Sequence, residues 1–134
     1  MRLKEILRQY LAIYIYSTKK NIAKIFNTDT IKQIDKDVFL KMIEDDKEAL
    51  VVDLRTPFEF NISHHPRAIN INYLSGFKEK IMKLDNTKTI FINCETAHRS
   101  PYATVSLKEV GFTKIYDLKK GFSQIRKIVK KMNT

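Results

Sequence analysis

The chain has 134 residues, one cysteine and 43% hydrophobic residues, with 3 glycines and 3 prolines. This composition is typical of one folded domain and excludes a disordered or fibrous protein, an internal disulfide and a cysteine-rich zinc site. The formal charge of +10 is concentrated near the two ends of the chain, at residues 1–24 and 114–134. Lysine-rich ends are more typical of a solvated surface than of a nucleic-acid groove, so we expect no nucleic-acid partner.

The first 16 residues are predicted to form an amphipathic helix. Its apolar residues recur at helical spacing: Leu3, Ile6, Leu7, Tyr10, Leu11 and Tyr14. Arg2, Lys4 and Arg8 lie on or beside its polar face. We therefore expect residues 1–28 to form a basic helical extension of a domain at residues 29–134. The helix either packs on this domain or mediates attachment to a membrane surface or self-association.

The start of the chain resembles a signal peptide only faintly. Arg8 and Gln9 interrupt the apolar region, and no pair of small residues follows as a cleavage site. No apolar run approaches the length of a membrane span. We expect a cytoplasmic protein, which the first helix could hold at the periphery of the membrane.

From about residue 30, short apolar runs alternate with helical periods. Four runs rich in Val, Ile, Phe or Tyr are predicted strands, at residues 49–54, 68–71, 89–93 and 114–118. Three sets of apolar residues are predicted helices, namely Val38, Phe39, Met42 and Ile43; Phe77, Ile81 and Leu84; and Phe122, Ile125, Val129 and Met132. The alternation predicts an α/β fold with a central parallel sheet flanked by helices on both faces. Ligands of such sheets bind beyond the carboxyl ends of the strands.

The segment TIFINCETAHRSPYATVSLKEVGF joins a predicted strand to a helix. Cys94 directly follows the strand, and the helix has boundary signals in Ser100 as N-cap, Pro101 at the first helical position and Gly111 at its end. The loop 94–99 can direct backbone NH groups at the sulfur. Such a nest, with the positive end of the helix dipole, predicts a lowered pKa of the thiol and a reactive thiolate. The alternative is a small buried apolar residue, the usual role of a lone cysteine.

This segment resembles the active-site loop of the rhodanese-like sulfurtransferases, C-R-x-G-x-R-S in many small bacterial members, which stands here as CETAHRS. VVDLRTPFEFNISHHPRAINI is similar to the family's D-x-R-x-x-x-E-[FY]-x-x-G-H-I-P-G-A-x-N signature, and VGFTKIYDLKKGF to its G-F-x-x-V-x-x-L-x-G-G tail. These resemblances cover about residues 30 to 130 in the family's order. The family fold is a parallel sheet flanked by helices, as the alternation also predicts.

The resemblance implies sulfur transfer through Cys94, with no metal and no organic cofactor. The thiolate attacks the outer sulfur of thiosulfate or of a protein persulfide. Because the chain has no second thiol, an external thiol or another thiophilic acceptor removes that sulfur. The residues implied to form the active-site loop and bind the donor are Glu95, Thr96, Ala97, His98 and Arg99. The residues implied to support the loop are Asp53, Arg55, Glu59 and Ser100, for which we expect a scaffold role.

Three departures from the family pattern have physical consequences. Glu95 occupies a position that is often basic in members that use thiosulfate. If its carboxylate points inward, it raises the pKa of Cys94 and repels a dianionic donor, whereas an outward carboxylate changes little. Ala97 replaces a common glycine, so a positive φ there carries strain. Family glycines are also replaced at Ser63 and Arg67.

Two histidines, His64 and His65, are adjacent in the sequence. His64 and His65 match the family's H-I positions, so we expect a loop feature and no metal site.

A Cys-dependent phosphatase or arsenate reductase has a longer loop than the four residues between Cys94 and Arg99, and a reductase needs a resolving thiol. A noncatalytic rhodanese-fold module for binding or regulation remains open, because a fold alone does not establish activity.

Overall fold

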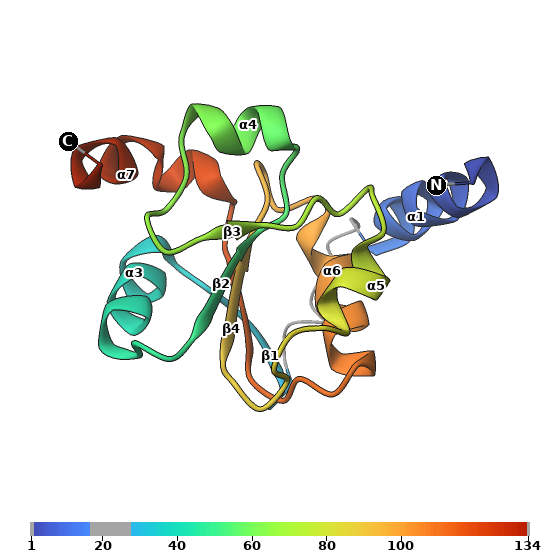
Figure 1. Ribbon diagram of the computed structural model, residues 1–134, viewed down its shortest axis with the longest axis horizontal. Helices are drawn as coiled ribbons and strands as arrows, with labels where there is room; N and C mark the ends of the chain where they lie inside the picture. The colour runs from blue at the N-terminus through green and yellow to red at the C-terminus, as the bar shows by residue number, and fades with distance from the viewer. Residues whose placement is uncertain (1, 17–27, 134) are drawn as a thin grey trace.

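The computed structural model describes residues 2–16 and 28–133 and has the expected α/β architecture (Figure 1). Five parallel strands form one sheet in the order β1-β5-β4-β2-β3. They are β1 (Ile31–Ile34), β2 (Leu50–Asp53), β3 (Ile69–Asn70), β4 (Ile90–Asn93) and β5 (Ile115–Leu118). The four predicted strands are confirmed. The edge strand β1 was not predicted, because Lys32 and Gln33 interrupt its short apolar pattern.

Helices cover both faces of the sheet (Figure 1). α5 (Phe77–Ile81) and α6 (Ser100–Glu109) lie on one face, whereas α3 (Lys36–Asp45), the 3₁₀ helix η1 (Phe122–Gln124) and α7 (Arg126–Met132) lie on the other. α4 (Pro57–Ile62), which was not predicted, lies beyond the carboxyl ends of the strands. The expected last helix is divided into η1 and α7 at Ile125.

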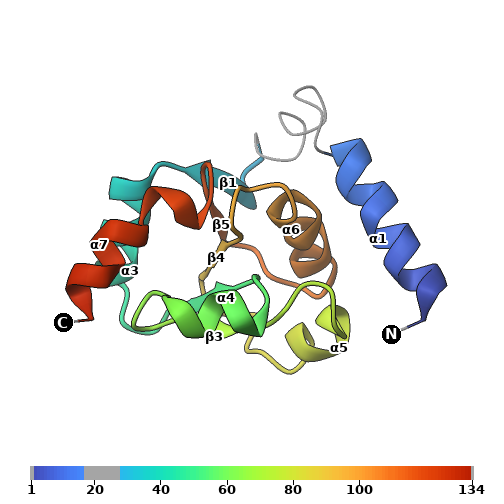
Figure 2. The same cartoon turned by 90° about the horizontal axis from the view of Figure 1, so that it is seen from above.

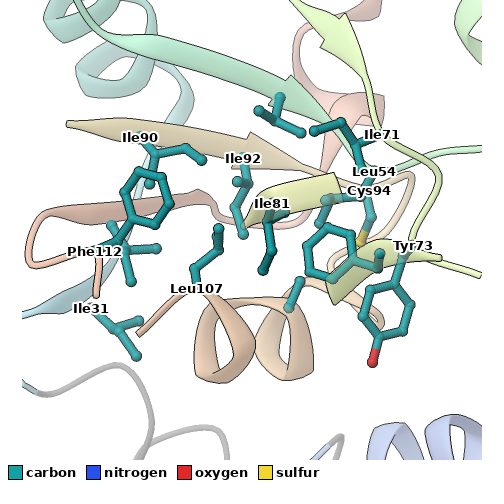
Figure 3. Close-up of a cluster of buried hydrophobic side chains, with 14 residues drawn as sticks. Ile31, Leu54, Ile71, Tyr73, Ile81, Ile90, Ile92, Cys94, Leu107 and Phe112 are labelled. Carbon is teal, nitrogen blue, oxygen red and sulfur yellow. The ribbon is translucent and has the colours of Figure 1, made fainter. Parts of the chain in front are cut away.

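Each strand of the sheet centre contributes to two apolar layers. Val52 and Ile92 pack against α5 and α6, in the cluster that also contains Cys94 (Figure 3). Val51 and Phe91 pack on the opposite side with Phe39 of α3. Burying such a side chain stabilises the fold by about 1.5–3 kcal/mol, which explains why the central strands read as unbroken apolar runs. Because β2 and β4 are parallel neighbours, the residues that follow them lie at the same edge of the sheet.

The predicted N-terminal helix is confirmed as α1 (Leu3–Tyr16), which lies beside α6 (Figure 2). Glu5 and Arg8 of α1 line a hollow of about 260 Å³ together with residues of α5 and α6. Leu3 and Leu7 are 70% and 59% exposed. The expected link to the main domain falls largely on residues 17–27, outside the described residues. No helix in the described part of the chain is long and apolar enough to cross a membrane.

Candidate active site

Cys94 lies immediately after β4, at the carboxyl edge of the sheet. Its side chain is 2% exposed and stands at one end of an apolar cluster (Figure 3). The backbone NH groups of Arg99 and Ser100 and the Ser100 hydroxyl form hydrogen bonds with the sulfur. A cavity of about 170 Å³ reaches Cys94 and is lined by Glu59, Cys94, Glu95, Thr96, His98 and Arg99. The structure thus brings together most of the loop residues that the sequence predicts.

The acidity of Cys94 differs from the sequence prediction. Burial is the largest influence and raises the pKa of the thiol, and the negative charge of Asp117 raises it further. The hydrogen bonds from Ser100 and Arg99 lower the pKa without overcoming these two effects. The predicted amide groups are therefore present, but the predicted lowering of the thiol pKa is wrong because the sulfur is almost completely removed from water.

Ser100 has a different role from the predicted N-cap. α6 begins at Ser100, with Arg99 in the N-cap position, and Pro101 follows in the first turn. The Ser100 hydroxyl donates a hydrogen bond to Asp117 Oδ2 at 2.8 Å, and both side chains are fully buried. The hydroxyl therefore serves the buried side of the site instead of capping the helix. The predicted end of the helix is confirmed, since α6 ends at Glu109 and Gly111 follows with φ of +104°.

The middle of the loop has a strained residue. Ala97 has φ of +62°, the conformation in which the sequence predicts strain for a residue that replaces glycine. An L residue in this region costs about 1–2 kcal/mol relative to its right-handed conformation. Thr96 and His98 flank Ala97 on the exposed rim, where Thr96 Oγ1 and His98 Nδ1 lie 2.6 Å apart. The loop therefore combines a buried sulfur, a strained centre and a polar rim.

Glu95 directs its carboxylate to two arginines. It forms an ion pair with Arg126, and its Oε1 lies 3.5 Å from Nη1 of Arg55. Glu95, Arg55 and Arg126 line a second cavity of about 220 Å³, together with Glu59, Ile62 and Ser63. Of the two orientations considered from the sequence, the structure has a paired carboxylate, and the charge that raises the pKa of Cys94 is that of Asp117.

Arg55 and Asp53 form a buried ion pair behind this second cavity. Arg55 Nε and Nη2 donate to Asp53 Oδ1 and Oδ2 at 3.0 and 2.8 Å, and Nη2 also donates to the Ser63 carbonyl at 2.6 Å. The guanidinium stands 3.7 Å from the centroid of the Phe122 ring. These contacts join the end of β2 to η1 and to the segment after α4.

Glu59 connects α4 to the cavity. Its carboxylate accepts from the backbone NH of Thr56 at 3.2 Å and from the Thr56 hydroxyl at 2.9 Å, which completes a capping box at the start of α4. Partial burial opposes ionisation, but these hydrogen bonds and the charges of Arg55 and Arg99 lower the pKa of Glu59. Glu59 therefore places a negative charge on the wall that Arg99 shares.

Three contributors to the site were not predicted: Asp117, Arg126 and Gly121. Gly121 lies against the backbone of Cys94 and Glu95, so close that a Cβ atom would stand 2.6 Å from the Cys94 carbonyl oxygen. Gly121 matches the second glycine at the end of the family's G-F-x-x-V-x-x-L-x-G-G pattern, so the sequence did contain a signal for its role. Asp117 and Arg126 reach the site through contacts between segments distant in the chain, and the sequence has no local signal for these contacts.

The two adjacent histidines are part of the loop after α4. His64 stacks on Phe60 with ring centroids 3.7 Å apart, and its Nδ1 lies 2.7 Å from the Phe60 carbonyl. His65 is buried and its Nδ1 accepts from the backbone NH of Arg67 at 3.1 Å. Among residues 2–16 and 28–133, no group of three or more His, Cys, Asp or Glu side chains could hold a metal ion.

Comparison with known proteins gives consistent matches. The family model described as "Rhodanese-like domain" matches residues 35–128. The tRNA uridine(34) hydroxylase of Pelagibacter ubique is 36% identical over 100 residues, which make up 73% of this chain and 33% of that protein. The adenylyltransferase and sulfurtransferase UBA4 of Saccharomyces cerevisiae is 28% identical over 68% of this chain and 24% of that protein. The chain spans a third or less of these two relatives.

A solved structure agrees with the sequence matches. The rhodanese-related protein of Thermoplasma volcanium has a TM-score of 0.59 and 29% identity, and the match covers 71% of this chain and 91% of that chain. The match thus spans nearly all of that smaller protein.

Proposed function

The chain belongs to the rhodanese-like domain family, and on that basis we propose that it is a sulfurtransferase that carries one sulfur atom on Cys94. A relative named as a sulfurtransferase supports this class of reaction, although it extends well beyond the matched region. The observation that carries the proposal is the hydrogen bonding of the Cys94 sulfur by the NH groups of Arg99 and Ser100 at the cavity. Two amides that converge on one sulfur stabilise an anion there.

The reaction has two balanced steps. The Cys94 thiolate attacks the outer sulfur of thiosulfate or of a persulfide. A bond forms between the two sulfurs as the donor's own sulfur bond breaks, and the donor leaves as sulfite or as a thiolate. An acceptor thiolate then attacks the outer sulfur of Cys94 persulfide and regenerates the Cys94 thiolate. Because Cys94 is the sole cysteine of the 134 residues, this acceptor is an external thiol or another thiophilic molecule.

The residues that line the cavity around Cys94 supply charged and polar groups for this chemistry. Arg99 lines it and supplies a positive charge for an anionic donor and for the outer sulfur of the persulfide. Thr96 and His98 supply polar groups at the rim. Glu95 is held by Arg55 and Arg126, so its charge is partly compensated before a donor arrives.

Mass spectrometry of the intact protein tests the proposal. Incubation with thiosulfate, or with a low-molecular-weight persulfide, should add the mass of one sulfur atom, and a thiol acceptor should remove it. Cys94→Ser should add none, whereas Ser106→Ala, a change on α6 away from the loop, should load like the unchanged protein. The absence of an adduct with every donor would contradict the proposal and favour a noncatalytic module.

The outer face of α1 supports a further proposal about partners, attachment to an anionic membrane surface. Leu3, Leu7 and Tyr10 are 70%, 59% and 50% exposed, and the basic side chains of Arg2 and Lys4 are exposed beside them. A basic helix with outward apolar side chains binds at the boundary between headgroups and acyl chains of anionic lipid.

Vesicle co-sedimentation with the full chain tests this attachment. Phosphatidylglycerol vesicles should retain more protein than phosphatidylcholine vesicles, and Leu7→Asp should reduce retention several-fold. Met82→Asp removes a similarly exposed apolar side chain, 66% exposed, outside α1 and should change little. Equal retention by both kinds of vesicle would contradict attachment to an anionic surface and indicate nonspecific binding. A concentration-dependent dimer that Leu7→Asp abolishes would contradict membrane attachment and indicate self-association.

A further inference from the structure

We propose that Asp117 is a positioning residue that acts as a neutral hydrogen-bond donor and stabilises the anionic sulfur of Cys94 through the hydroxyl of Ser100. The inference rests on the proposed function, because it concerns the anion that sulfur transfer requires. It assigns a role to a buried acidic side chain that the loop chemistry described above does not use.

The three side chains form a continuous buried chain of contacts. Asp117 lies on β5, opposite Ile92 of the adjacent β4, and Cys94 follows two residues after Ile92. The Ser100 hydroxyl lies 2.8 Å from Asp117 Oδ2 and also forms a hydrogen bond with the Cys94 sulfur. Asp117 and Ser100 are both 0% exposed, and Cys94 is 2% exposed. A proton can therefore pass along this chain without entering bulk water.

The surroundings of Asp117 favour its neutral form. Its Oδ2 accepts a hydrogen bond from the Ser100 hydroxyl on α6, whereas its Oδ1 is buried without a hydrogen-bond partner. Gln33, an uncharged residue, lies opposite Asp117 on β1. Burial raises the pKa of Asp117 to about 8, and hydrogen bonding lowers it only in part. Among the described residues that face it from β1, β4 and α6, the other titratable group is Cys94.

Two ionisable groups in one buried site share a single negative charge more easily than they carry two. When Cys94 is a thiol and Asp117 is ionised, Ser100 donates to Asp117. When the sulfur is anionic, Asp117 holds a proton and donates it to Ser100 Oγ, and Ser100 donates to the sulfur. The change between these forms breaks the S–H bond of Cys94, forms the O–H bond of Asp117, and uses Ser100 to pass the proton. A buried carboxyl kept neutral in this way acts as a hydrogen-bond donor.

The rate of Cys94 alkylation by iodoacetamide tests this arrangement in the full chain. The reagent reacts with thiolate, and Cys94 is the sole cysteine, so the rate against pH follows its ionisation. The unchanged protein should show a broad profile with two ionisations. Asp117→Asn keeps a donor and loses the charge, so it should show one ionisation at lower pH. A thiol pKa lowered by one unit gives about tenfold faster alkylation at pH values below both pKa values, where the thiolate is the minor form.

Asp117→Leu removes both the charge and the hydrogen-bond donor, whereas Asp117→Asn removes only the charge. A comparison of these two variants therefore isolates the effect of the donor. Asp117→Leu should react several-fold more slowly than Asp117→Asn at neutral pH. Ser100→Ala, which retains the carboxyl but breaks the connection, should react as slowly as Asp117→Leu. Glu48→Gln removes an exposed carboxylate and should leave the profile unchanged. Circular dichroism selects the variants that fold, so that Ser100→Ala still gives a result if Asp117→Leu does not.

The alkylation rates of the variants can contradict the role of Asp117 in two ways. Coinciding profiles for Asp117→Asn and the unchanged protein would overturn the coupling. Equal rates for Asp117→Asn and Ser100→Ala at neutral pH would overturn the donor role. Alkylation needs no sulfur donor, so differing profiles together with no sulfur adduct would retain the Asp117 inference and reject the proposed function.

Discussion

Gly121 and Cys94 lie in direct main-chain contact, although 26 residues separate them in the chain. Gly121 has φ of +81°, and the next residue, Phe122, donates its NH to the Cys94 carbonyl at 2.8 Å. Ser123 donates to the Glu95 carbonyl at 3.3 Å. The segment after β5 therefore holds the first two residues of the loop, Cys94 and Glu95. The amides of Arg99 and Ser100, at the end of the loop, remain directed at the sulfur.

Gly121→Ala should destabilise the fold and disturb the loop. The added Cβ would meet the Glu95 carbonyl oxygen at 2.4 Å, and an L residue at positive φ costs a further ~1–2 kcal/mol. We expect a total loss of about 3 kcal/mol in the free energy of unfolding, measured by urea denaturation, with slower sulfur loading of Cys94.

Gly76→Ala is the matched control for this change. Gly76 also has positive φ, +60°, but its added Cβ meets only Glu79 Oε2 at 3.7 Å, an ordinary contact. It should lose about 1 kcal/mol. Equal losses for the two variants would show that the close approach to the loop contributes nothing to stability.

Ala97→Gly should stabilise the protein despite the greater flexibility of glycine in the unfolded chain. Its φ of +62° is strained for alanine and easily accessible to glycine. We expect a gain of about 0.5–1 kcal/mol in thermal or urea unfolding. Ala103→Gly, in the buried middle of α6, should instead lose stability because glycine is a poor helix residue. A loss for Ala97→Gly would contradict the inferred strain.

The elements around Cys94 were predictable because their signals are local. The apolar runs of β2 and β4 reflect strands buried on both faces, and the change from a strand to a helix around Cys94 is encoded by the residues themselves. α4 was missed although Thr56 and Glu59 form a capping box, because six residues offer too short a period. The signal was present in the spacing of these two residues.

The electrostatics of the site were less predictable than its position. Ser100 fits an N-cap pattern, but its hydroxyl instead meets Asp117, a residue of another strand. Glu95 was considered the carboxylate that affects Cys94, whereas its partner is Arg126 of α7. Each outcome depends on how strongly a group is buried and on which distant segment it meets, so local spacing contains no information about either.

Glu95→Gln should improve the use of thiosulfate. Removal of the carboxylate leaves the guanidiniums of Arg55 and Arg126 to act on an incoming dianion at the adjoining cavities. We expect a several-fold lower KM for thiosulfate in an assay of sulfite release, and a stronger dependence on ionic strength. Glu48→Gln changes the net charge equally at an exposed site away from these cavities and serves as the control. Equal KM values for both variants would contradict a local effect of Glu95.

Two buried groups should make stability depend on pH in opposite directions. Burial raises the pKa of Asp117 from 3.8 to about 8, so between these values the folded protein holds a proton that the unfolded chain has lost. The free energy of unfolding therefore falls as pH rises, by up to about 1.4 kcal/mol per pH unit. Burial and the charges of Arg67 and His64 lower the pKa of His65 from 6.5 to about 4, so His65 contributes a rise with pH in that range.

The two contributions oppose each other between pH 4 and 6.5, and Asp117 acts without His65 between 6.5 and 8. Urea denaturation across this range should therefore show a fall in stability above pH 6.5 that is much smaller in Asp117→Asn, whose amide does not titrate. His65→Gln should remove the compensating rise and extend the fall below pH 6.5. If the unchanged protein and Asp117→Asn lose stability equally between pH 6.5 and 8, Asp117 is ionised in the folded state, because a carboxylate with an ordinary pKa has no proton to lose in this range.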